Sequence, residues 1–125
     1  MFNQILLYIA SALTVFWGTA HLIPTKSVLQ GFGEITADNK RIIAMEWITE
    51  GVALIFIGVL VATVTAVDAS NVVSRSVYGV SAIGLLVLAA VSLFTGFRVK
   101  FLPFKLCPFI FTASAILILL GGLML

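Results

Sequence analysis

The stretch IIAMEWITEGVALIFIGVLVATVTAV, residues 42–67, decides the fold. As a helix rising about 1.5 Å per residue, it is long enough to cross a hydrocarbon core about 30 Å thick. Only Glu46 and Glu50 interrupt it with charge. Three further apolar stretches cover residues 2–23, 76–97 and 107–125. We therefore predict an all-α, polytopic membrane protein in which four transmembrane helices form an antiparallel bundle.

The composition supports this class. Of the 125 residues, 62% are hydrophobic and only 10% are charged, too few charged side chains to cover a water-soluble domain. The four stretches use almost the whole chain, which predicts one domain over residues 1–125. The first stretch has no basic n-region and no A-x-A-like cleavage site, which indicates a retained helix and not a signal peptide. The single cysteine, Cys107, excludes an internal disulfide, and we expect an inert residue at the membrane interface.

Basic side chains are concentrated in two of the three predicted loops, residues 24–41 and 98–105. In chain order they are Lys26, Lys40, Arg41, Arg98, Lys100 and Lys105. The second loop carries only Arg75. By the positive-inside rule, loops 24–41 and 98–105 are cytoplasmic and both termini lie outside, in what we expect to be a bacterial inner membrane. The expected partner of such a chain is the lipid bilayer, and nothing in it indicates nucleic-acid binding.

Five residues are predicted to bind a ligand: Trp17, His21, Glu46, Trp47 and Glu50. Ionisable groups inside a bilayer are costly, face the protein interior or water, and usually mark function. The two glutamates lie one turn apart and share a helix face. His21 lies at a similar depth on the antiparallel neighbour, and the two tryptophans border the same faces. Hydroxyl groups in the same half of the bundle come from Ser92, Thr95, Thr112 and Ser114. The sequence therefore predicts a polar pocket in the cytoplasmic half.

Two carboxylates beside an imidazole suit proton transfer, a protonatable quinone or a cationic amphiphile. A plain packing seam, with the histidine hydrogen-bonded to a glutamate, is the structural alternative. One histidine and one cysteine make a thin ligand set, so we predict no metal site. No acyl-transfer triad, phosphate-binding loop or Cys-x-x-Cys pair is present. Catalytic residues and cofactors are therefore left undetermined.

Two segments carry a resemblance to a known family. The segment FWGTAHLIP, residues 16–24, looks like the end of the first helix in the DoxX-like family of small four-helix membrane proteins. The segment MEWITEGVALIFIG, residues 45–58, is similar to that family's second helix. His21 stands where a lysine is often seen. The resemblance implies a four-helix fold and association with quinol oxidation or another membrane redox system.

Three functional interpretations remain open. The leading one is a small inner-membrane protein that binds a quinone or another hydrophobic molecule, or serves a membrane redox system. The second is a proton-coupled transporter resembling the small multidrug resistance proteins, although their essential glutamate lies in the first helix. The third is a lipid or sterol isomerase resembling the four-helix emopamil-binding group. A homodimer or a membrane partner subunit is left open by all three.

Overall fold

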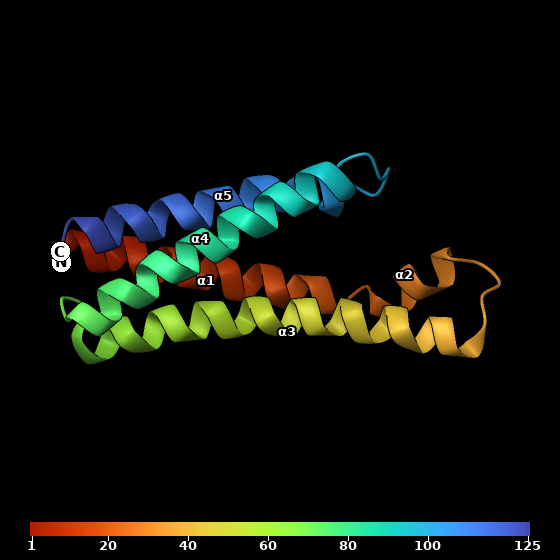
Figure 1. The fold of residues 1–125 in the computed structure, drawn as a ribbon, viewed down its shortest axis with the longest axis horizontal. Coiled ribbons are helices and arrows are strands. Elements are labelled where there is room, and N and C mark those ends of the chain that lie inside the picture. The colour runs from red at the N-terminus through yellow and green to blue at the C-terminus, as the bar shows by residue number, and fades with distance from the viewer.

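The computed structural model describes residues 1–125 and contains five helices and no strands (Figure 1). The helices are α1 (Phe2–Leu22), α2 (Thr25–Gly31), α3 (Ala37–Asp68), α4 (Val72–Thr95) and α5 (Leu102–Leu123). All except α2 are long and apolar enough to cross a membrane. The predicted all-α polytopic bundle is therefore confirmed.

The four long helices run in alternating directions, so the bundle has two distinct ends (Figure 1). At one end the chain termini lie side by side, and Asn3 Nδ2 donates a hydrogen bond of 2.7 Å to the Met124 carbonyl oxygen. The opposite end carries α2, the start of α3 and the connection from α4 to α5. Helix α1 packs against both α3 and α5, while α4 packs mainly against α5.

Glycines let α1 and α3 approach closely. A Cβ atom added at Gly18 would lie 2.7 Å from the Gly51 carbonyl oxygen, and one added at Gly58 would lie 2.7 Å from the Ser11 carbonyl oxygen. Small residues of this kind are typical of tight helix contacts in membranes, where backbones approach for dispersion contacts. The close contact between the two helices fixes the relative positions of the side chains at their far ends.

The buried core joins all four long helices. Its largest buried side chains include Leu7, Leu54, Tyr78, Leu85 and Phe111. The one buried tyrosine is satisfied, because its hydroxyl lies 2.9 Å from Thr65 Oγ1.

Some helix boundaries differ from the predictions. Helix α3 begins at Ala37 and not near residue 42, with Thr36 as N-cap accepting a hydrogen bond of 3.2 Å from the Asn39 amide. Its 32 residues span about 48 Å, so it extends well beyond a hydrocarbon core about 30 Å thick. Helix α2 was not predicted. Helix α5 begins at Leu102 and not near residue 107, so Pro103 lies in its first turn and Pro108 lies inside it.

Candidate functional site

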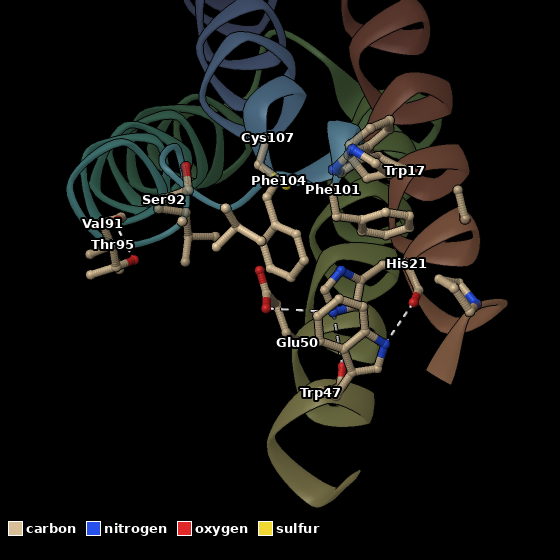
Figure 2. Close-up of a pocket in the computed structure, with 16 residues that line it drawn as sticks. Trp17, His21, Trp47, Glu50, Val91, Ser92, Thr95, Phe101, Phe104 and Cys107 are labelled. Carbon is tan, nitrogen blue, oxygen red and sulfur yellow. Dashed lines mark hydrogen bonds and ion pairs between the residues drawn. The ribbon is translucent and has the colours of Figure 1, made fainter. Parts of the chain in front are cut away.

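A pocket of about 500 Å³ opens at the α2 end of the bundle, where α4 and α5 meet α1 and α3 (Figure 2). Sixteen residues line it: Trp17, Ala20, His21, Pro24, Trp47, Glu50, Leu88, Val91, Ser92, Thr95, Gly96, Val99, Phe101, Pro103, Phe104 and Cys107. Four of the five predicted ligand-binding residues are among them. The volume lies within the usual range for small-molecule sites, about 300–1,000 Å³.

His21 and Trp47 bond reciprocally across the contact between α1 and α3. His21 Nε2 lies 3.1 Å from the Trp47 carbonyl oxygen, and Trp47 Nε1 donates a bond of 2.8 Å to the His21 carbonyl oxygen. The two rings also stack, with centroids 3.9 Å apart and an interplanar angle of 18°. Because a carbonyl oxygen only accepts, Nε2 must carry the proton. The backbone of α3 therefore holds the imidazole in one tautomer and one orientation.

The Glu50 carboxylate faces the same space, and no N–H or O–H group of the protein donates a hydrogen bond to it. Its Oε2 lies 3.5 Å from His21 Nε2, beyond the usual N–H···O range of 2.7–3.2 Å. The His21 side chain is 7% exposed and that of Glu50 is 42% exposed, so the carboxylate and not the imidazole is the accessible partner. No lysine or arginine forms an ion pair with Glu50. The carboxylate oxygens of Glu50 are therefore available to accept hydrogen bonds from a bound molecule.

Aromatic rings form much of the remaining wall. The rings of Trp47 and Phe104 have centroids 5.6 Å apart, and those of Phe101 and Phe104 have centroids 6.0 Å apart. Trp17 lines the pocket from α1, and its buried Nε1 has no hydrogen-bond partner. Cys107 lines the same pocket from α5. The pocket therefore combines one carboxylate and one imidazole with apolar and aromatic surface.

Glu46 lies outside this group. It is exposed, does not line the pocket, and forms no ion pair. The buried positions of α3 continue from Gly51 and Leu54 at intervals of three or four residues. Trp47 lies one turn before Gly51 and belongs to this stripe, whereas Glu46 is rotated from it by about 100°. Glu50 lies at the edge of the stripe and so reaches the pocket.

The predicted hydroxyl groups divide between pocket and core. Ser92 and Thr95 line the pocket from α4. Both donate to carbonyl oxygens of their own helix, at 3.0 and 2.6 Å. Thr112 lies outside the lining and donates to the Pro108 carbonyl oxygen at 2.7 Å, and Ser114 is buried with no hydrogen-bond partner. The hydroxyls therefore gather at the pocket only from α4.

The sequence analysis did not identify the contribution of α5. Phe101, Phe104 and Cys107 line the pocket, and Phe111 is buried in the core at 2% exposure. Cys107 is expected from the sequence at the membrane interface, and the structure places it in the pocket wall with Phe101 and Phe104, where it is 8% exposed. Their spacing of three and four residues is the available signal, since it marks one helix face. That face continues from the core into the pocket wall.

The ionisable side chains that line the pocket are His21, Glu50 and Cys107. No three histidine, cysteine or acidic side chains converge in a way that could hold a metal ion. The polar chemistry that the lining itself offers is therefore hydrogen bonding and one negative charge. No protein-family model, curated protein or solved structure matches the chain, so the chemistry of the pocket has to be argued from its own residues.

Proposed function

We propose that this integral membrane protein binds a hydrophobic small molecule in the pocket between its helices. The observation that carries the proposal is the lining: aromatic and apolar side chains from four helices surround a single His21–Glu50 pair. Ligand sites of this kind are mostly apolar, and a few convergent polar groups orient the bound molecule. In this proposal Glu50 and His21 contact the polar group of the ligand, and Trp17, Trp47 and Phe104 contact its apolar part.

The proposal includes an orientation. Six of the seven basic residues lie at the α2 end of the bundle, where the pocket opens, and only Arg75 lies near the other end. The positive-inside rule therefore favours a pocket at the cytoplasmic side of a bacterial inner membrane, with both termini outside. Membership of the DoxX-like family and service to a membrane redox system belong to the same proposal and rest on residues 16–24 and 45–58.

Intrinsic fluorescence offers a direct binding assay, since both tryptophans of the chain line the pocket. The purified protein in maltoside micelles would be titrated with decylubiquinone and with dodecanol. We expect a saturable change in emission for at least one probe. The variant Ser92→Phe should weaken that binding by about tenfold or more, a loss of about 1.4 kcal/mol, because the new ring fills the pocket.

Ser76→Phe is the matched control, because it makes the same substitution at an exposed position of the same helix, outside the pocket. Its affinities should equal those of the wild type, and both variants should keep wild-type helicity. Either of two results would refute the proposed function. In the first, the protein binds neither these probes nor any other long-chain compound saturably. In the second, the Ser92→Phe variant binds like the wild type.

A further inference from the structure

We infer that the ligand is a single-chain amphiphile with an ammonium head group, which binds at Glu50 while its chain runs toward α2. The inference rests on the proposed function and specifies its ligand class. Quinones, fatty acids and alcohols can carry the same apolar chain but have other head groups. The Glu50 carboxylate distinguishes an ammonium head group from these.

The first argument is that the Glu50 carboxylate accepts no hydrogen bond and has no lysine or arginine as a partner. The His21 Nε2 group lies 3.5 Å from the carboxylate, but it is engaged by the Trp47 carbonyl oxygen at 3.1 Å. The Glu50 side chain is 42% exposed and so is open to an incoming group, and a carboxylate is stabilised by an opposite charge and by hydrogen-bond donors. An ammonium group supplies both. A quinone carbonyl or a fatty-acid carboxylate brings only acceptors to an acceptor, which is unfavourable.

The second argument is the aromatic surface beside the carboxylate. Figure 2 shows the Phe104 ring and the Glu50 carboxylate turned toward the same space. Trp47 lies next to Phe104, at 5.6 Å between ring centroids. A cation is attracted to the faces of such rings, by about 0.5–2 kcal/mol depending on desolvation. Anionic head groups gain nothing comparable there, so the rings favour the same head group as the carboxylate does.

The third argument is the path for the chain. A second cavity of about 510 Å³ shares Val99, Phe101 and Phe104 with the pocket and extends to Val28 and Phe32 at α2. None of its lining residues is ionisable. The two cavities adjoin at these three side chains, with a carboxylate in the first and only apolar and small polar surface in the second. This polarity matches an amphiphile with one charged end.

The test compares dodecylammonium, dodecanol and dodecanoate at neutral pH, in maltoside micelles that contain no ammonium lipid, by tryptophan fluorescence. We expect dodecylammonium to bind at least tenfold more tightly than the other two. Glu50→Gln should reduce this preference to about twofold or less while dodecanol binding persists, and Glu46→Gln should retain it. Glu50→Asp, which withdraws the carboxylate by one methylene group, should weaken the preference if Glu50→Gln does not fold.

The chain path has its own test. Dodecylammonium should bind more tightly than octylammonium, and Val28→Phe, which narrows the second cavity, should remove most of that difference. Equal affinities for the three head groups, or a preference that survives Glu50→Gln, would overturn the inference but leave the proposed function standing. Failure of all three twelve-carbon probes to bind would instead count against the proposed function itself.

Discussion

His21 and Trp47 each bond to the backbone of the other's helix, so neither side chain can turn without breaking a bond between α1 and α3. This reciprocal pairing matters more for the site than the 3.5 Å separation of His21 and Glu50. It commits the proton of Nε2 to a carbonyl group and leaves the neighbouring carboxylate available. A single backbone contact thus decides which of the two ionisable side chains meets a ligand.

Replacing Trp47 by Phe should destabilise the protein more than replacing Trp17 by Phe. Both substitutions replace an indole by a smaller phenyl ring. Only Trp47→Phe removes a hydrogen bond, the 2.8 Å bond to the His21 carbonyl oxygen. The difference should be about 0.5–1.5 kcal/mol in the free energy of unfolding, measured by denaturation in mixed micelles. Equal destabilisation by the two variants would show that the bond contributes nothing.

Cys107 should react slowly with a small maleimide, because it is only 8% exposed. The comparison is Leu106→Cys in a Cys107→Ala background, since Leu106 lies beside it on α5 and is 38% exposed. We expect the rate at Cys107 to be at least tenfold lower, and to fall further when dodecanol occupies the pocket that Cys107 lines. Similar rates at the two positions, or no protection by a bound probe, would contradict this placement of the thiol.

At the scale of helices, the contact between α1 and α3 depends on glycine. Gly18→Ala should destabilise the bundle by about 1–3 kcal/mol, because the new methyl group meets backbone atoms that cannot move independently. Its Cβ would lie 2.7 Å from the Gly51 carbonyl oxygen and 2.9 Å from the Ile55 amide nitrogen.

Gly84→Ala is the control for this variant, since nothing lies within 4 Å of its added Cβ and it occupies the middle of α4. It should be neutral or stabilising by up to about 1 kcal/mol, through helix propensity alone. Thermal unfolding of both variants in the same micelles provides the measurement. An unchanged melting temperature for Gly18→Ala would mean that the two helices are not in the close contact described.

Hydropathy predicted the four spanning helices well and their ends less well. It detects the apolar part of a helix, so it missed the first turns of α3, where Asp38, Lys40 and Arg41 are helical outside the apolar stretch. Helix α2 is seven residues long and too short for a periodic signal. At the site, periodicity placed Glu46 and Glu50 on one face. It could not show that Trp47 occupies the contact with α1 and leaves Glu46 outside.

Across the whole molecule, the pocket and six of the seven basic residues lie at one end, and the chain termini lie at the other. Helix α3 extends beyond the membrane at the pocket end, by roughly 18 Å if its far end is level with the opposite surface. An amphiphile in the leaflet at this end would then meet the second cavity, which lies between α2 and the connection from α4 to α5. The orientation of the bundle therefore decides from which leaflet a ligand is taken.

Cysteine accessibility in intact cells can determine this orientation. In a Cys107→Ala background, Ser70→Cys lies in the exposed turn between α3 and α4, and Glu34→Cys lies in the exposed segment between α2 and α3. A membrane-impermeant maleimide should label Ser70→Cys from outside and Glu34→Cys only after lysis, because loops rich in lysine and arginine stay in the cytoplasm. The reverse pattern would place the pocket at the outer surface, and labelling of both positions from outside would indicate two orientations of the chain. The first result would mean that the ligand has to be sought in the outer leaflet, and the second that it has to be sought in both leaflets. The arguments from Glu50 and its aromatic neighbours would be unaffected.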